Sequence, residues 1–243
     1  MASPLVVIIV VKWNGQADTL ACLASLARID YPAAHVVVVD NGSTDDSVAV
    51  IRAAFPAMTV LEIGHNLGYV GGNNAGLEYA RQQQADYALL LNNNTEVAPD
   101  FLTRLVEGAE AAAVGAASPA IYYHALPESF WSMGGPMDWQ RGDTTMLGEG
   151  QQDTGQFGGQ PFAVDFVTGC ALLIKIAVVD RIGPLDARFF AYYEDVEWCV
   201  RVGRAGDKVA VIPAAKIWHK ITPKARFASD SLGTTGLATG CCS

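Results

Sequence analysis

Four short polar clusters in the first hundred residues carry side chains that could bind a ligand, and each follows an apolar run. They are Trp13-Asn14-Gly15, Asp40-Asn41-Gly42-Ser43, His65-Asn66-Leu67-Gly68 and Asn92-Asn93-Asn94. Asparagine and aspartate can hydrogen-bond the edge of a nucleobase or a ribose hydroxyl, and glycine lets the backbone approach a ligand closely. A single asparagine in a loop is usually a turn residue. Four clusters in corresponding positions favour one shared ligand.

The second candidate for chemistry is an adjacent carboxylate pair, Glu194-Asp195, at the start of a helical pattern that runs to Arg204. A hydroxyl group that attacks in a displacement needs a base to take its proton, and a carboxylate can serve. The helix N-terminus favours ionised Asp195, whereas two adjacent negative charges raise the pKa of one of the pair. The alternative interpretation is that Asp195 only caps its helix.

Apolar periodicity predicts the elements that position these residues. Strands are predicted at residues 6–11, 36–39, 58–63 and 87–91, and they alternate with helices at residues 19–28, 43–55, 73–84 and 99–113. This alternation is typical of right-handed βαβ units with a parallel sheet. Ligands of such sheets bind beyond the carboxyl ends of the strands, which is where the polar clusters lie.

The rhythm changes after residue 115. Strands are predicted at residues 114–123, 129–139, 165–176, 209–212 and 216–218, with a short helix ending at residue 181 and a longer one at residues 195–204. Residues 141–160 lack apolar periodicity and are predicted to form a loop. We expect a single domain over residues 1–222, with halves at 1–115 and 116–222, and a disordered tail at 223–243.

Composition excludes several classes of protein. The chain has 243 residues and a formal net charge of −9, which argues against nucleic-acid binding. No uncharged apolar run reaches the ~18 residues that cross a bilayer, and no signal peptide is recognisable, so we expect a cytoplasmic protein without a transmembrane segment. Five irregularly spaced cysteines do not form a disulfide framework. The run from Lys12 to Ala17 lacks the Gly-x-Gly-x-x-Gly of a dinucleotide-binding domain.

Several motifs resemble, in the same order, those of the family 2 glycosyltransferases. In the first half they are VVIIVVKWNG (6–15), VVVVDNGSTDDS (36–47), NLGYVGGNNAGL (66–77) and LLLNNNTEVAPDFL (89–102). In the second half they are VDFVTGCALLIK (164–175), FFAYYEDVEWCVRVGRAG (189–206) and IWHK (217–220). The resemblance covers residues 4–220 and is closest to the rhamnosyltransferase-like branch. It implies the α/β, Rossmann-like GT-A fold of nucleotide-diphospho-sugar transferases, with a mostly parallel central sheet, a nucleotide-sugar donor and inversion at the anomeric carbon.

The resemblance also implies roles for individual residues on the donor side. Asp40 resembles the acidic residue that contacts the base or the ribose, and Asn14 and Asn41 lie beside it. The other residues that the resemblance places on the donor are Asn66, Gly68, Asn73, Asn92 and Asn93.

A divalent metal, Mg²⁺ or Mn²⁺, is a further implication of the resemblance. Asn94 stands at the last position of a DxD-like motif, where the family usually has aspartate, and His219 resembles a histidine that completes a metal or diphosphate site. An amide brings no charge to a hard cation, so we expect weak metal binding that depends on the donor. Glu96 compensates only if the chain stays extended past Asn93.

On the acceptor side, Glu194-Asp195 resembles the ED motif that supplies the catalytic base, and Asp165 and Trp198 are expected to face the acceptor. The predicted function is transfer of a sugar, with rhamnose as a candidate, from a dTDP- or UDP-sugar to a saccharide or lipid-linked saccharide in cell-surface polysaccharide synthesis. A lipid-linked acceptor would bring the protein to the inner face of the membrane. Two alternatives stay open: a non-catalytic nucleotide-sugar-binding domain, favoured by Asn94, and a sugar nucleotidyltransferase, for which Lys12 is weak support.

Overall fold

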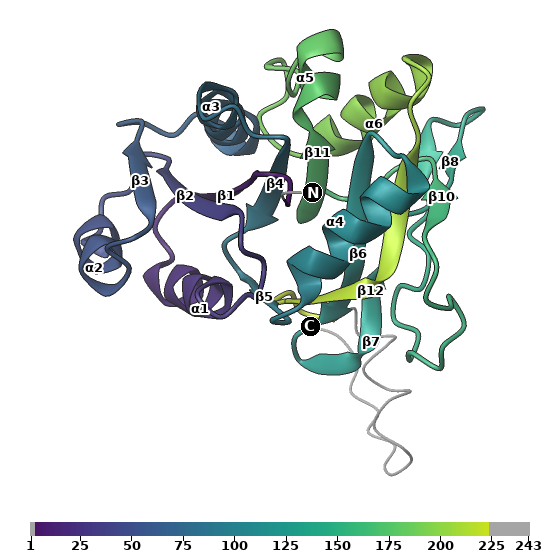
Figure 1. Ribbon diagram of the computed structural model, residues 1–243, viewed down its shortest axis with the longest axis horizontal. Helices are drawn as coiled ribbons and strands as arrows, with labels where there is room; N and C mark the ends of the chain where they lie inside the picture. Colours follow the sequence, from purple (N-terminus) through teal and green to yellow (C-terminus); the bar gives the residue numbers. More distant parts are fainter. Residues whose placement is uncertain (1–2, 224–243) are drawn as a thin grey trace, which may run out of the picture.

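The first half of the chain forms parallel strands, as its alternating pattern predicts (Figure 1). The computed structural model describes residues 3–223. The parallel strands are β1 (Val6–Lys12), β2 (Ala34–Asp40), β3 (Thr59–Glu62) and β4 (Tyr87–Asn92). They lie in the order β4-β1-β2-β3, and each neighbouring pair is parallel. Their carboxyl ends therefore meet at one edge of the sheet, with the polar clusters along it.

The second half extends the same sheet. Its strands are β5 (Thr95–Val97), β6 (Ala116–Tyr123), β7 (Leu126–Ser132), β10 (Phe162–Val164), β11 (Ala171–Lys175) and β12 (Val209–His219), and β8 (Met137–Asp138) pairs separately with β9 (Asp143–Thr144). Strand β11 lies between β4 and β6 and is antiparallel to both, whereas β12 is parallel to β6. The full order is β10-β12-β6-β11-β4-β1-β2-β3, so one continuous sheet joins the two halves.

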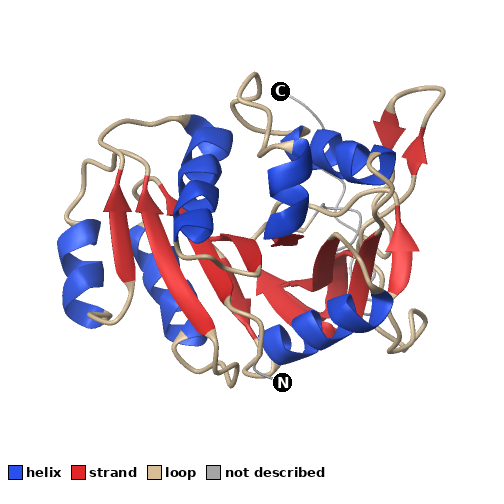
Figure 2. Ribbon diagram, turned by 45° about the horizontal axis from the view of Figure 1, so that its top comes forward, coloured by secondary structure: helices blue, strands red, loops and turns tan. Residues whose placement is uncertain are grey.

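Helices cover both faces of the sheet (Figure 2). One face carries α1 (Gln16–Leu26), α2 (Ser47–Ala54) and α4 (Phe101–Ala112), and the other carries α3 (Gly68–Gln82), α5 (Ile176–Ile182) and α6 (Glu194–Arg204). Alternate residues of β1 enter the two cores: Val7 and Ile9 pack with α3, and Ile8 packs on the side of α1. A strand buried on both faces needs apolar residues at every position, which explains the unbroken apolar run.

Within residues 3–223, no helix is both long and apolar enough to span a bilayer. Cys22, Cys170 and Cys199 are buried free thiols, as their apolar surroundings predict. The predicted tail lies almost wholly outside the described residues.

Helix α3 begins at Gly68, five residues before the predicted start at residue 73. Its first turns are rich in glycine, which disfavours a helix by about 1 kcal/mol per residue relative to alanine. Tertiary packing overrides this propensity. A Cβ on Gly72 would lie 2.6 Å from the side chain of Val11, and one on Gly76 would overlap Ile9. Here glycine allows the helix to approach β1 closely.

Helix α2 begins at Ser47, later than the predicted cap at Ser43 or Thr44. The Ser43 hydroxyl instead accepts a hydrogen bond from the Lys12 ammonium at 2.7 Å. The serine is therefore tied to β1, and the helix starts only after it.

Three predicted strands differ from the structure in ways that shape the site. The strand predicted at residues 165–176 is interrupted, because residues 165–170 run between β10 and β11 without pairing as a strand. The strands predicted at 209–212 and 216–218 form the single strand β12, with a register shift between Ile212 and Lys216. The short strand β5 was not predicted.

Candidate active site

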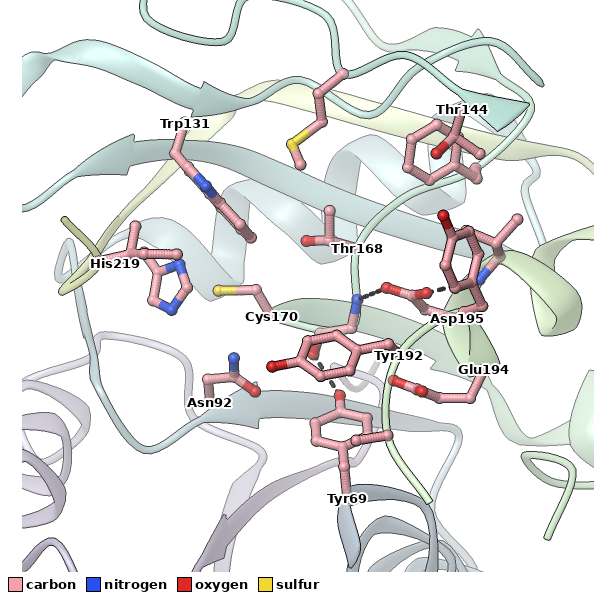
Figure 3. Close-up of a pocket in the computed structure, with 17 residues that line it drawn as sticks. Tyr69, Asn92, Trp131, Thr144, Thr168, Cys170, Tyr192, Glu194, Asp195 and His219 are labelled. Atoms are coloured by element: carbon pink, nitrogen blue, oxygen red, sulfur yellow. Dashed lines mark hydrogen bonds between the residues drawn. The ribbon is translucent and has the colours of Figure 1, made fainter. Parts of the chain in front are cut away.

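A pocket of about 550 Å³ lies where the first turn of α3, the end of β4, the segment before β11, the start of α6 and the end of β12 converge (Figure 3). It contains both members of the carboxylate pair and two of the predicted donor and metal residues. The polar and aromatic residues of its wall include Tyr69, Asn92, Trp131, Thr168, Tyr192, Glu194, Asp195 and His219. The pocket therefore lies next to the edge that carries the polar clusters.

Backbone amides hold the Asp195 carboxylate in one orientation. Its Oδ2 accepts a hydrogen bond from the Gly169 N–H at 2.7 Å, and its Oδ1 accepts one from the Val196 N–H at 2.8 Å. Burial raises the pKa of Asp195, and these two donors oppose that shift. Asp195 is thus an oriented, partly buried carboxylate in the pocket wall.

Glu194 is the first residue of α6, and its side chain is buried, with the residue only 5% exposed. Burial, with a smaller contribution from the charge of Asp195, raises the pKa of Glu194 from 4.5 to about 7. The preceding residues, Tyr192 and Tyr193, both adopt left-handed backbone conformations, with φ of 72° and 66°. Such strain in residues other than glycine is common at functional sites. The pair therefore combines one fixed carboxylate with one group that exchanges its proton near pH 7.

Three buried polar atoms in the wall of this pocket have no hydrogen-bond partner among residues 3–223. They are Thr168 Oγ1, Glu194 Oε2 and His219 Nδ1. A fourth such atom, on Asp207, lies in an ion pair with Arg181 and outside the pocket. An unsatisfied buried polar group costs about 1–3 kcal/mol, so three in one cavity indicate a place for a polar ligand.

His219 ends β12 at the pocket wall and contacts Trp131 edge to face, with ring centroids 4.5 Å apart. Burial lowers the pKa of His219 to about 4, so the imidazole is neutral at pH 7. A neutral imidazole can ligate a metal or accept a hydrogen bond.

The residues around His219 test whether a metal fits. Asn93 and Asn94 form the turn between β4 and β5, and Asn94 bonds Lys220 through both its backbone and its side chain. This turn breaks the extended conformation that Glu96 would need in order to share a face with Asn94. The Glu96 carboxylate instead pairs with Lys220 at 3.0 Å. Within residues 3–223, no group of three His, Cys, Asp or Glu side chains could hold a metal ion. His219 lies in the pocket wall and Asn94 at the adjoining turn, and both bring neutral groups, so an ion there would need further oxygen ligands.

At the end of β2, Asp40 is 4% exposed and bonds the buried Lys12 ammonium at 2.9 Å. Its other oxygen accepts a hydrogen bond from the Ser43 N–H at 3.1 Å. Despite burial, these donors hold the pKa of Asp40 below its usual value. Asp40 therefore lies at the expected edge as part of an internal ion pair.

Asn41 uses both ends of its amide to hold the third polar cluster. Its Nδ2 donates to Asn66 Oδ1 and to the Gly68 carbonyl, both at 3.0 Å, and its Oδ1 accepts from the Leu67 N–H at 3.0 Å. Asn41 and Asn66 are thus brought together, while Gly68 is buried beneath Phe190.

The remaining predicted donor residues also make internal bonds. Asn14 accepts a hydrogen bond from the Thr44 N–H at 3.0 Å, and Asn93 donates to the Thr19 hydroxyl at 2.9 Å. Asn73 is buried and donates to the Tyr69 carbonyl at 2.9 Å, inside α3. Of these predicted donor residues, Asn92 is the one whose side chain lies in the pocket.

Comparison with protein families matches residues 7–182 to the family described as Glycosyl transferase family 2. The chain belongs to glycosyltransferase family 2. An N-acetylglucosaminyl-diphospho-decaprenol L-rhamnosyltransferase of Mycobacterium tuberculosis is 26% identical over 219 residues, which cover 81% of this chain and 70% of the relative. The dTDP-rhamnosyl transferase RfbF of Shigella flexneri is 21% identical over 216 residues, 89% of this chain and 69% of the relative.

Solved structures confirm the GT-A fold of this glycosyltransferase. GalNAc-T7, solved with UDP, GalNAc and Mn²⁺, superposes with a TM-score of 0.73 at 14% identity over 90% of this chain. A mannosyltransferase from Pyrobaculum calidifontis, in complex with GDP-Man and Mn²⁺, gives a TM-score of 0.67 at 18% identity over 92% of this chain. The glycosyltransferase described here spans 43% and 59% of those two chains.

Two residues expected at the acceptor do not line this pocket of the glycosyltransferase. Trp198 is fully buried in the core, and its indole N–H donates to the Gly183 carbonyl at 3.1 Å, so the expectation that it faces an acceptor is wrong. Asp165 is exposed outside the pocket, where its carboxylate accepts a hydrogen bond from the Met137 N–H at 2.8 Å. Trp198 lies on the face of α6 that packs into the core, and Asp165 lies in the irregular segment after β10.

Sequence reasoning did not assign a role to Tyr69, Thr168 or Gly169, although all three line the pocket. The available signal was Gly169, because a glycine inside an apparent strand often marks a bulge or a close backbone approach.

Proposed function

We propose that this glycosyltransferase moves a sugar from a nucleotide-diphospho-sugar to a hydroxyl group of a saccharide, with inversion at the anomeric carbon. The observation that carries the proposal is the oriented Asp195 beside buried Glu194, in a pocket that also holds Thr168 and His219 atoms without partners among residues 3–223. The pocket adjoins the sheet edge where the donor clusters lie. Transfer of a glycosyl group to a hydroxyl requires an oriented base beside a cavity that can hold the substrates.

The relatives suggest the substrates. Because the Shigella relative is named a dTDP-rhamnosyl transferase, dTDP-rhamnose is the first donor to test, and UDP-sugars come second. The mycobacterial relative's name contains an N-acetylglucosaminyl-diphospho-decaprenol, so a sugar-diphospho-lipid is the first acceptor. Such an acceptor belongs to cell-surface polysaccharide synthesis and would bring the protein to a membrane face.

In the reaction, the Asp195 carboxylate takes the proton of the acceptor hydroxyl while its oxygen attacks the anomeric carbon. The bond from that carbon to the nucleoside diphosphate breaks as the new glycosidic bond forms, and the diphosphate leaves with its electron pair. Because the pKa of Glu194 is about 7, its protonation state sets the charge beside Asp195 near neutral pH. A divalent cation, when bound through His219 and Asn94, would neutralise charge on the leaving diphosphate.

The test is Asp195→Asn, which preserves the shape of the side chain but removes the proton acceptor. Transfer from dTDP-rhamnose to a synthetic N-acetylglucosaminyl-diphospho-prenol should fall by at least ~100-fold, with unchanged dTDP affinity. Near-normal transfer by the variant would show that Asp195 only orients α6.

Assays of the wild-type protein distinguish this function from the two alternatives, a non-catalytic binding domain and a nucleotidyltransferase. A non-catalytic binding domain would bind dTDP-sugars without transferring or hydrolysing them. A nucleotidyltransferase would instead release pyrophosphate from dTTP and a sugar 1-phosphate.

A further inference from the structure

The first turn of α3 is linked to Asp195 through a single glycine. The Tyr69 hydroxyl donates to the Gly169 carbonyl at 2.6 Å, and the Gly169 N–H donates to Asp195 Oδ2 at 2.7 Å (Figure 3). We propose that Tyr69 is a positioning residue for the base, because its phenol holds Gly169 where the glycine N–H orients the Asp195 carboxylate. The proposal rests on the role of Asp195 proposed above.

The contact between Tyr69 and Gly169 requires the glycine. A Cβ built on Gly169 would lie 2.5 Å from the Tyr69 hydroxyl oxygen, which is too close for any side chain. The phenol therefore reaches the backbone only because position 169 has no side chain. The two residues are 100 positions apart in the chain, so this is a tertiary contact and not a consequence of local structure.

Tyr69 is itself held on both sides. The Asn73 amide donates to the Tyr69 carbonyl at 2.9 Å. Gly68, directly before it, has a φ of +73°, and a Cβ there would lie 2.5 Å from the Phe190 carbonyl oxygen. The Val70 N–H donates to that same carbonyl at 3.4 Å. The first turn of α3 thus packs against the loop that leads into Glu194 and cannot shift freely.

The electrostatic surroundings keep the phenol a donor. Burial and the nearby carboxylates of Asp195 and Glu194 raise the pKa of Tyr69 well above 10, so its proton stays in place. Near Asp195, burial also keeps the thiols of Cys170 and Cys199 protonated by raising their pKa values. Tyr192, Tyr193 and His219 line the same pocket, and burial lowers the pKa of His219 to about 4. Glu194 is therefore the neighbour whose charge changes near pH 7.

Tyr69→Phe tests the proposal because it removes the hydroxyl and keeps the ring. With dTDP-rhamnose and the prenol-linked acceptor, kcat should fall about 3- to 10-fold, the range of one hydrogen bond, while dTDP affinity is unchanged. The acidic limb of the pH profile of kcat should move to higher pH. A displaced Gly169 donates less well to the ionised Asp195, and this raises the pKa of the base.

The matched control is Tyr31→Phe. Tyr31 is also buried, and its hydroxyl donates to the backbone carbonyl of Pro4 at 2.7 Å, far along the chain from Gly169. This control should leave both kcat and the pH profile as in the wild type. Gly169→Ala, which crowds the phenol away, is the second variant and should shift the pH profile in the same direction as Tyr69→Phe.

A wild-type pH profile and kcat in Tyr69→Phe would overturn the proposal. Weakened dTDP affinity with an unmoved pH profile would also overturn it, since Tyr69 would then contact the donor. If Asp195→Asn retains transfer, the proposed base is wrong whatever Tyr69→Phe does, so the two failures are distinguishable.

Discussion

The sheet edge around Lys12, Asp40 and Asn41 differs from the neighbouring pocket in how its buried polar groups are paired. At the edge, the buried Lys12 ammonium bonds Asp40, Ser43 and Ser47 at 2.9, 2.7 and 2.5 Å, and every polar group of the Asn41 side chain is engaged. In the pocket, polar atoms of Thr168, Glu194 and His219 are buried without partners in the described chain.

The difference indicates that the two regions have different roles. A loop whose side chains satisfy one another keeps its shape, so the edge forms a rigid frame that can present backbone and amide groups to a nucleotide. A buried group without a partner destabilises the fold and is kept where a ligand or a reaction uses it. The comparison predicts that substitutions at the edge reduce stability, whereas substitutions of the unpartnered groups relieve instability.

The largest effect is expected for Lys12→Met. The variant leaves the Asp40 carboxylate buried without its cation, which should lower the free energy of unfolding by ~3–5 kcal/mol in urea denaturation. Adding Asp40→Asn should recover part of the loss because no buried charge remains. The control is Arg52→Met, which breaks the half-exposed pair with Glu62 and should cost less than ~1 kcal/mol. Equal losses at the two sites would remove the distinction between edge and surface.

The next effect is a pH-dependent gain in stability for Glu194→Gln. The folded-state pKa of Glu194, about 7, lies above its ordinary value of 4.5, so ionisation is harder in the folded protein. The wild-type protein should therefore lose stability from this group as pH rises from 4.5 to 7, and the full penalty applies above 7. Relative to wild type, the variant should gain up to about 3 kcal/mol near pH 8 and almost nothing near pH 4.

Chemical denaturation at both pH values measures this difference. Glu197→Gln is the control on the same helix, because Glu197 already accepts a hydrogen bond from Arg201 at 2.8 Å and should show no gain at high pH. A gain for Glu194→Gln that is the same at both pH values would mean that the charge of this buried group is not its cause.

The smallest effect concerns the metal and Asn94→Asp. The wild-type protein should bind no measurable Mn²⁺ without nucleotide, because His219 and Asn94 are neutral ligands. With dTDP present, Asn94→Asp should tighten Mn²⁺ binding about 10-fold, or ~1.4 kcal/mol, in calorimetric titration. Tight Mn²⁺ binding by the wild-type protein alone would contradict this account and point to His219 or Glu96 as a stronger ligand.

The elements that could be predicted from the sequence are those whose local pattern and packing agree. Strand β1 and the strand and helix that follow were expected within a few residues, since an apolar run buried on both faces allows few alternatives. Helix α3 was expected to start too late because its glycines serve contacts with Val11 and Ile9, which no local rule contains. The interruption at residues 165–170 was missed for the same reason, because it contains the long-range contact of Gly169 with Tyr69.

By itself, the sequence determined that a parallel sheet would gather the polar clusters at one edge and that an acid pair would begin a late helix. Both follow from periodicity and from residue type, which are local properties. Only the tertiary structure decided which polar groups satisfy one another and which are left for chemistry. Asp40 is hydrogen-bonded to Lys12 across 28 positions, Asp195 to Gly169 across 26, and Tyr69 to Gly169 across 100. Partners so distant in sequence are selected by how the strands and helices pack, and that packing buries Trp198 while it opens the pocket around Glu194.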